Sequence, residues 1–203
     1  MGNEVKGAVR AGQQRHEGKI LLETSEIIFR GADFRLKIPF AEMTDVSACN
    51  GELRVKTKSA MTEFELGSAA EKWREKILHP KTRAQKLGVK QGTRIRLAGE
   101  FDADFLQELK ASKAAILGEA SADSPEITFL AVAAKGSLAA IAKHAKKLIA
   151  AQALWVVYPK GKKEITEIDI INAGRKTALK DVKVVGFSAT HTALKFVLPL
   201  EKR

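Results

Sequence analysis

The 203-residue sequence is poor in the residues that build metal and redox sites. Its one cysteine, Cys49, excludes an intramolecular disulfide and a cysteine-based zinc cluster. Its four histidines have neither metal-type spacing nor a His-Glu-x-x-His motif. The sequence therefore predicts no metal site and gives no reason to expect another cofactor.

The familiar catalytic and membrane motifs are missing as well. The chain contains no phosphate-binding Gly-x-x-x-x-Gly-Lys-Ser/Thr loop, no Gly-x-Gly-x-x-Gly and no Gly-x-Ser-x-Gly. Its longest nearly apolar run, residues 148–159, is interrupted by Gln152 and is too short to span a bilayer. The polar start lacks the apolar segment of a signal peptide. We expect no catalytic residues, no transmembrane segment and a cytoplasmic protein.

Aromatic residues make up only 6% of the chain, and no basic–aromatic run offers a stacking platform for single-stranded nucleic acid. Positive charge, by contrast, is abundant: the formal net charge is +11. Residues 1–80 are nearly neutral, whereas residues 81–92 and 93–203 carry the excess of lysine and arginine. Such a field favours an anionic partner, either an acidic protein, a phosphorylated ligand or a nucleic-acid backbone. A soluble protein with a lysine-rich surface is the alternative.

Residues 18–66 have the pattern of short antiparallel strands. Apolar and charged residues alternate from Phe34 to Ile38, as in a strand with one buried and one solvent-exposed face. Turn signals lie at residues 31–33 and at Asn50-Gly51, a strong hairpin signal. A helix follows, in which Ser68 and Glu71 form a capping box and Trp73 lies on the apolar face.

This meander closed by a Trp-bearing helix resembles the pleckstrin-homology-like fold, including its GRAM-type and bacterial versions. The residues that carry the resemblance are 34–43, 51–53 and 64–66, followed by the Trp73 helix. Many such domains bind lipids or peptides, but the basic cluster of phosphoinositide binders is missing from the first hairpin. The resemblance therefore implies a protein-contact or structural domain over residues 1–80, and it argues against phosphoinositide binding.

The remainder of the chain changes pattern. Residues 81–92 are basic and poor in apolar side chains, and we expect them to form a connector. Residues 93–203 alternate strands with helices, which predicts a three-layer α/β domain with a mostly parallel sheet. Its expected helices are residues 102–110, 137–150 and 166–177, and its last strand, near residues 194–198, is expected to be antiparallel.

Several motifs of this half resemble an uncharacterised bacterial domain-of-unknown-function family. They include residues 86–92, Leu154-Trp155-Val156-Val157-Tyr158-Pro159-Lys160 and Asp181-Val182-Lys183-Val184. The family reads Leu-Trp-Val-x-Trp-Pro-Lys at the central strand, so Tyr158 stands where it has a second Trp. The resemblance covers about residues 82–200 and implies a fold, because the family has no assigned activity.

Two loops place lysine and glycine between a strand and a helix. They supply the candidate anion-binding residues Lys135, Gly136, Ser137, Lys160, Lys162, Lys163 and Thr166. Helix starts present unpaired N–H groups and partial positive charge, which suit an anion. Ordinary loop composition, with Ser137 as a helix cap, is the alternative.

Three functions fit these patterns. The first is a non-enzymatic two-domain binding or adaptor protein that contacts an anionic partner through its basic α/β domain. The second is an enzyme that acts on a phosphorylated or carboxylated small molecule at the carboxyl ends of the strands. The third is a nonspecific binder of nucleic acid.

Overall fold

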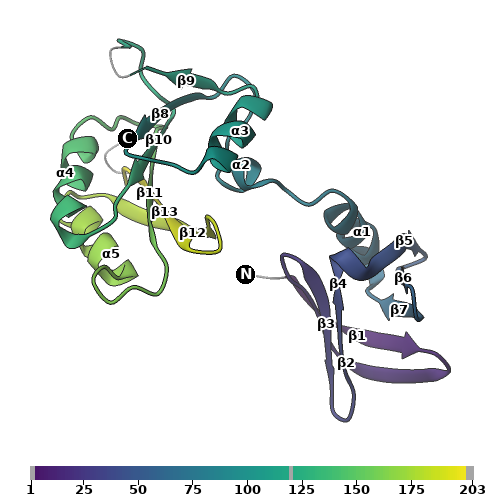
Figure 1. Ribbon diagram of the computed structural model, residues 1–203. Helices are drawn as coiled ribbons and strands as arrows, with labels where there is room; N and C mark the ends of the chain where they lie inside the picture. Colours follow the sequence, from purple (N-terminus) through teal and green to yellow (C-terminus); the bar gives the residue numbers. More distant parts are fainter. Residues whose placement is uncertain (1–2, 119–120, 200–203) are drawn as a thin grey trace. The chain divides into compact units, whose positions relative to one another are not determined.

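The computed structural model describes residues 3–118 and 121–199, and the chain divides into two compact units. The first unit is Met1–Lys81 and the second is Thr82–Arg203 (Figure 1). One is built on an antiparallel sheet and the other on a mixed sheet with helices, which gives an α+β content. No helix in the described residues is long and apolar enough to cross a membrane.

The first unit contains one antiparallel sheet of seven strands. The strands are β1 (Asn3–Ala11), β2 (Gln14–Leu22), β3 (Glu26–Gly31), β4 (Arg35–Pro39), β5 (Met43–Cys49), β6 (Glu52–Thr57) and β7 (Met61–Glu65). Their order in the sheet is β4-β3-β2-β1-β7-β6-β5. The chain therefore forms two meanders that meet where β1 pairs with β7.

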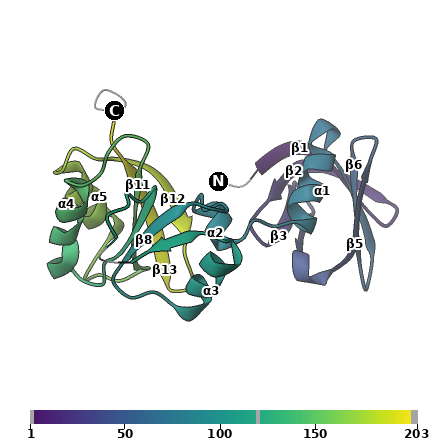
Figure 2. The same ribbon diagram turned by 90° about the horizontal axis from the view of Figure 1, so that it is seen from above.

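A single helix, α1 (Ala70–Leu78), completes the core of this unit. It packs against β5 and β6 (Figure 2), and its buried residues are Ala70, Trp73 and Ile77, the face that the sequence predicts. Trp73 is only 2% exposed. Because a large aromatic core side chain contributes roughly 3–5 kcal/mol against truncation to alanine, Trp73 anchors α1 to the sheet.

The start of α1 differs from the predicted capping box. A 3-10 turn, Gly67–Ala69, precedes the helix, and no side chain caps either element. The Ala69 N–H donates to the Leu66 carbonyl, and the Ala70 N–H donates to the Gly67 carbonyl. The backbone itself satisfies these donors, so Ser68 is not needed as a cap.

The hairpin between β5 and β6 has the predicted turn. Asn50 and Gly51 both have positive φ, at 51° and 83°, as a two-residue hairpin turn requires. The strands β1 and β5 were not predicted, because their sequences carry few large apolar residues. β1 nevertheless contributes the buried Ala8 and Val9 and joins the two meanders.

The second unit contains a mixed sheet of six strands. Its elements are α2 (Arg83–Lys86), β8 (Arg94–Ala98), α3 (Ala103–Ala111), β9 (Ala115–Leu117), β10 (Ile127–Ala131), η3 (Lys135–Leu138), α4 (Ala139–Ala145), β11 (Ala153–Pro159), α5 (Glu167–Arg175), β12 (Lys180–Gly186) and β13 (His191–Val197). The order is β12-β13-β11-β10-β8-β9. The strands β9, β8, β10 and β11 are parallel, and β13 is antiparallel to both neighbours, as the sequence predicts for the last strand.

Helices cover both faces of this sheet (Figure 1). On one face, Phe129 and Trp155 share a core with residues of α2 and α3. On the other face, Leu154 and Val156 share a core with residues of α4 and α5. Successive residues of β11 thus enter opposite cores, which explains why the strand reads as one continuous apolar run.

Two predicted boundaries of this unit differ from the structure. The expected connector, residues 81–92, contains α2, and its Ala84, Leu87 and Val89 are buried in the core beside α3. A few apolar residues among charged ones suffice for a one-turn helix to pack by one face. The helix expected over residues 137–150 ends at Ala145, and i→i+3 turns continue to Leu148.

Candidate functional site

The strand order of the second unit reverses between β8 and β10. From β8 the chain passes through α3 to β9 on one side, and from β10 it passes through α4 to β11 on the other. In open sheets with parallel strands, the crevice beyond the carboxyl ends of the strands at such a reversal is where ligands bind. The structure has a crevice at this place.

The crevice has a volume of about 650 Å³, which is in the range of small-molecule sites. Its wall is formed by the segments that follow β8 and β10, by Arg83 of α2 and by the turn between β12 and β13. The lining residues that carry the argument are Glu100, Phe101, Asp102, Asp104, Phe187 and His191. Phe187 is buried and Phe101 partly buried, so the floor is apolar, while Glu100 and Asp104 are exposed at the rim.

Gly99 shapes the point at which β8 leaves the sheet. Its φ is +96°, a backbone conformation that side chains disfavour. A Cβ built at this position would lie 2.9 Å from the Cβ of Ala131, at the end of β10. Only glycine lets the two strand ends approach this closely, so Gly99 keeps the crevice in its present shape.

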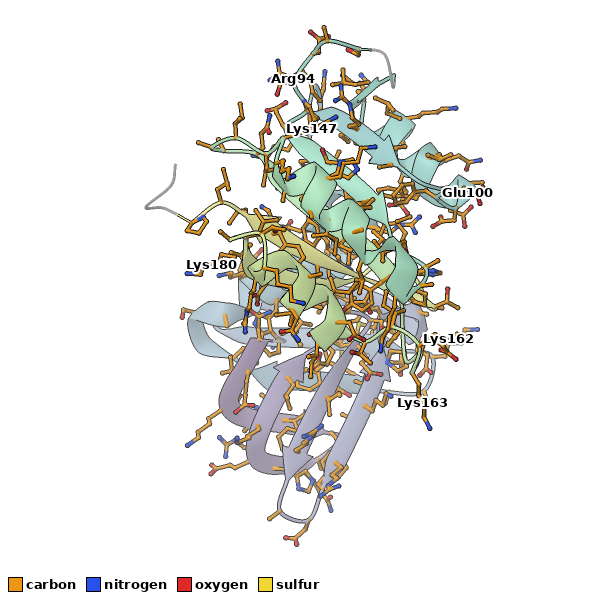
Figure 3. The ribbon with its side chains drawn as sticks, turned by 90° about the vertical axis from the view of Figure 1, so that its left-hand side faces the viewer. Arg94, Glu100, Lys147, Lys162, Lys163 and Lys180 are labelled. Carbon is orange, nitrogen blue, oxygen red and sulfur yellow. The ribbon has the colours of Figure 1, made fainter. Side chains whose placement is uncertain are left out.

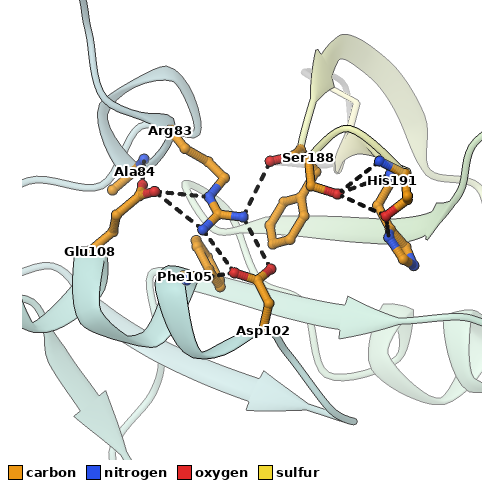
Figure 4. A network of polar contacts seen from close by, with 9 residues as sticks. Arg83, Ala84, Asp102, Phe105, Glu108, Ser188 and His191 are labelled. Atoms are coloured by element: carbon orange, nitrogen blue, oxygen red, sulfur yellow. Dashed lines mark hydrogen bonds and ion pairs between the residues drawn. The ribbon is translucent and has the colours of Figure 1, made fainter.

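Arg83 fixes the wall of the crevice through two carboxylates (Figure 4). Its guanidinium donates to both carboxylate oxygens of Asp102, at 3.0 and 3.1 Å, and to Glu108 at 3.2 Å. It also donates to the carbonyl of Phe187 and lies 5.0 Å and 4.7 Å from the ring centres of Phe105 and Phe187. Arg83 therefore ties α2, α3 and the β12–β13 turn together.

The pKa values in this network follow from the balance of burial and hydrogen bonding. Burial alone would raise the pKa of Asp102, but hydrogen bonds from Arg83 and from the Phe105 N–H outweigh it and hold the pKa below the ordinary value. Burial would likewise lower the pKa of Arg83, and its bonds to Asp102 and Glu108 raise it instead. Arg83 and Asp102 are therefore both charged at neutral pH.

The net charge of the crevice is negative. Glu100, Asp102 and Asp104 contribute carboxylates, and the one guanidinium, that of Arg83, is already paired with Asp102 and Glu108. His191 adds an imidazole whose Nδ1 lies 2.9 Å from the Thr190 hydroxyl. Unpaired acceptors thus outnumber unpaired donors among the described groups.

The predicted residues at the start of η3 and α5 already have internal partners. The Ser137 hydroxyl donates to the Ala134 carbonyl at 2.7 Å. Thr166 is the N-cap of α5, and its N–H and hydroxyl both donate to the carboxylate of Asp169. These two bonds hold the pKa of Asp169 below its ordinary value, and Lys135 lies 3.8 Å from the same carboxylate. The structure thus brings Lys135 and Thr166 together around Asp169.

The other predicted residues lie on the turn that follows β11. Lys160, Lys162 and Lys163 are exposed, and none of them has an ion-pair partner among residues 3–118 and 121–199. Figure 3 shows Lys162 and Lys163 directed away from the ribbon. Gly136 lies in η3 and is exposed, with no atom within 4 Å of the position a Cβ would take.

A hollow of about 720 Å³ in the first unit is a weaker candidate. It lies over β1, β2 and β7, and its guanidinium, Arg15, donates to both oxygens of Glu65 and to Glu17. Arg15, Glu17 and Glu65 thus satisfy one another. The described residues also contain no group of three or more His, Cys, Asp or Glu side chains that could hold a metal ion.

The sequence predicted ligand binding at the carboxyl ends of the strands but did not single out Arg83 or the acidic residues of this crevice. Arg83 lies in the segment expected to be a connector. The available signal was Gly99 directly after a strand and followed by three acidic residues within five positions, Glu100, Asp102 and Asp104. The contribution of Phe187 comes from a hairpin far along the chain, which no local pattern reveals.

Comparisons with known proteins give no family. No protein-family model matches the chain, and no similar protein was found by sequence among curated proteins. Among solved structures, the N-terminal PH domain of human ARAP2 aligns over 50% of this chain and 93% of its own, with 12% identity and a TM-score of 0.31. A TehB-like SAM-dependent methyltransferase from Corynebacterium glutamicum aligns over 64% of this chain and 96% of its own, with 14% identity and a TM-score of 0.37.

A third structure is the C-terminal domain of an unknown protein from Leishmania infantum, which aligns over 34% of this chain and 72% of its own, with 14% identity and a TM-score of 0.30. These TM-scores are too low to support an argument about the fold. The description of the fold therefore relies on strand order and strand pairing alone. The resemblance of residues 82–200 to an uncharacterised bacterial family stays a prediction.

Proposed function

We propose that the second unit binds a small molecule in the crevice beyond the carboxyl ends of β8, β10 and β11. The observation that carries this proposal is the coincidence of a cavity of about 650 Å³ with the reversal of strand order. The apolar floor offers contact area to a ligand, and the polar rim can fix the ligand's orientation, as is usual in small-molecule sites.

The charge of the crevice selects the ligand chemistry. Three carboxylates face one guanidinium that is already paired, so a phosphate or carboxylate group would be repelled. A neutral or positively charged compound with hydroxyl or amine donors would instead satisfy the free oxygens of Glu100 and Asp104. A nucleoside without phosphate, or a ring compound of similar size, fits the apolar floor and these acceptors.

This class differs from the phosphorylated or carboxylated substrate that the sequence suggests. That expectation relied on the lysines that follow β10 and β11. Lys135 has a carboxylate partner in Asp169, whereas the lining of the crevice contains no lysine. The acidic side of the rim, and not the basic turns, lines the cavity.

Calorimetric titration tests the proposal with the four ribonucleosides and their 5′-monophosphates as probes. We expect saturable binding of at least one nucleoside, with the matching monophosphate weaker by roughly tenfold or more, since repulsion of about 1.4 kcal/mol corresponds to that factor. Asp104→Asn should reduce the difference between the two. Glu164→Gln, an exposed acid outside the crevice, is the matched control. Binding of no nucleoside, or tighter binding of the monophosphates, contradicts the proposal.

A second candidate function is contact with an anionic partner, as in an adaptor protein. The observation that favours it is the cluster of Lys160, Lys162 and Lys163, which are exposed and have no ion-pair partner among the described residues. Such groups attract an acidic protein or a nucleic-acid backbone, with affinity that falls as salt rises.

Chromatography on immobilised heparin tests this second candidate. The double variant Lys160→Glu and Lys163→Glu should elute at clearly lower salt than Lys90→Glu with Lys110→Glu, which changes the net charge equally at exposed positions elsewhere in the second unit. Equal elution of the two double variants would remove this turn from the interaction.

We further propose that the first unit is a pleckstrin-homology-like domain that serves protein contact or structure. The order of its seven antiparallel strands and the closing helix α1 support this. Two lysines of its first four strands have carboxylate partners: Lys19 lies 2.9 Å from Glu4, and Lys37 lies 2.9 Å from Glu26. Vesicles containing phosphoinositide should therefore retain the protein no better than vesicles of equal charge that lack it.

A further inference from the structure

The amino-terminal side of the second sheet carries a small basic pocket that is separate from the crevice. Its volume is about 190 Å³. It is lined by Arg96 and Thr128, from the paired strands β8 and β10, by His144 and Lys147 at the end of α4, and by the loops that lead into β10 and β11. Among the described residues, Asp123 supplies the one carboxylate of the lining.

Arg96 is held in place by backbone groups. Its Nη2 donates to the carbonyl of Ser121 at 2.9 Å and to the carbonyl of Asp123 at 3.0 Å. Its Nε is buried and has no hydrogen-bond acceptor among the described residues. A buried donor without a partner costs free energy, and a guanidinium keeps its full charge when it is held by carbonyls alone. Arg96 therefore adds a fixed positive charge to the lining of the pocket.

Two other basic side chains, Lys147 and His144, line the pocket. Lys147 is exposed and has no ion-pair partner among the described residues. Burial lowers the pKa of His144, and the positive charges of Lys147, Lys143 and Arg96 lower it further. The carboxylate of Asp123 is not among the groups that change the pKa of His144. It accepts a hydrogen bond from the Ser121 hydroxyl at 3.4 Å.

We propose that this pocket binds a single small oxyanion, such as inorganic phosphate or the phosphate group of a small molecule. Arg96 and Lys147 would supply the positive charge, and His144 would take up a proton as the anion binds. The volume is smaller than the roughly 300 Å³ at which drug-sized ligand sites begin, which suits one tetrahedral anion.

The experiment is a titration of the whole protein with inorganic phosphate and with sulfate, at constant ionic strength in chloride, followed by NMR of the histidine ring protons. Bound oxyanion should raise the pKa of His144, because a negative charge favours the imidazolium. The ring protons of the other three histidines should not shift with the same half-saturation. Acetate, a planar carboxylate, should bind more weakly.

Single substitutions distinguish binding in a defined pocket from a general attraction of anions to a positively charged surface. Lys147→Gln should weaken phosphate binding by roughly threefold to tenfold, the effect of one partly screened charge. Lys146→Gln, the next residue on the helix and outside the pocket, makes the same charge change and should have little effect. Arg96→Lys retains the charge but removes Nε, and we expect about a tenfold loss because lysine cannot copy the fork of donors.

Three results would overturn the proposal. They are the absence of a saturable shift of His144, equal weakening by Lys146→Gln and Lys147→Gln, and loss of binding in Lys162→Gln, which would place the anion on the turn after β11. Arg96→Lys also removes the bonds to the carbonyls of Ser121 and Asp123, so the two lysine variants decide the matter independently of its folding.

Discussion

Replacing Arg83 with methionine tests how the crevice wall is held. Methionine retains the unbranched apolar stem of the side chain and removes the guanidinium with its charge and donors. Only 13% of the Arg83 side chain is exposed, and it serves two carboxylates and the Phe187 carbonyl. The substitution therefore leaves Asp102 and Glu108 without their cation.

The expected cost follows from the exposure of these partners. Removing one member of a fully buried ion pair costs about 3–5 kcal/mol. The side chains of Asp102 and Glu108 retain 42% and 33% exposure, so water takes over part of the lost contact. We expect the free energy of unfolding of the second unit to fall by about 2–3 kcal/mol, since the bonds are charge-assisted but half solvated.

Tryptophan fluorescence can follow this unit alone. The chain has two tryptophans, Trp73 in the first unit and Trp155 in the second, so a Trp73→Phe background reports only the second. Denaturant unfolding then compares Arg83→Met with Arg175→Met, whose ion pair with Asp181 is 64% exposed on the arginine side. The control should lose less than about 1 kcal/mol. Equal losses in the two variants would refute the assigned role of Arg83.

The ion pair between Arg83 and Asp102 also makes the free energy of unfolding depend on pH. The pKa of Asp102 is lower in the folded protein than in the unfolded chain, so its stabilising contribution is complete above the unfolded pKa, about 3.9. The contribution is lost as the pH falls through the folded value. The difference in stability between the parent and Arg83→Met should thus be constant near neutral pH and should shrink below about pH 4.

Three further predictions concern single residues. Gly174→Ala would place a Cβ 2.2 Å from the ring of Phe196, so we expect a loss of about 1–3 kcal/mol in the stability of the second unit by denaturant unfolding. Tyr158, the one tyrosine, is buried and donates to Glu167 at 2.8 Å, so both effects raise its pKa; an ultraviolet absorbance titration should find it ionising well above pH 10, and ordinary ionisation would contradict the contact. Gly99→Ala should weaken any crevice ligand and destabilise the unit, whereas an unchanged protein would show that the close approach to β10 is unimportant.

Local patterns in the sequence predicted the elements that local forces determine. The turn at Asn50-Gly51 has the expected positive φ values, and the apolar face of the Trp73 helix is buried as expected. The start of α5 likewise follows its sequence, because Thr166 and Asp169 satisfy one another in a capping box. These features depend on residues at most four positions apart.

The features that the sequence left unpredicted depend on distant partners. β1 has little apolar content and becomes a strand because β2 and β7 supply its hydrogen bonds. Residues 83–89 have the composition of a linker and pack only because α3 offers a core and Glu108 receives the Arg83 guanidinium and the Ala84 N–H. The crevice and the basic pocket likewise combine residues from separate strands, helices and hairpins, which a single sequence does not place together.

The central claim is that small molecules bind beyond the carboxyl ends of β8, β10 and β11. The direct measurement is an NMR titration of the isotope-labelled protein with the ribonucleosides, in which backbone amide shifts locate the bound compound. The account predicts the largest shifts at Gly99, at Phe101 and in residues 187–191, with no change in the first unit. Shifts centred on residues 160–163 or on the first unit, or no saturable shift with any nucleoside, would contradict it.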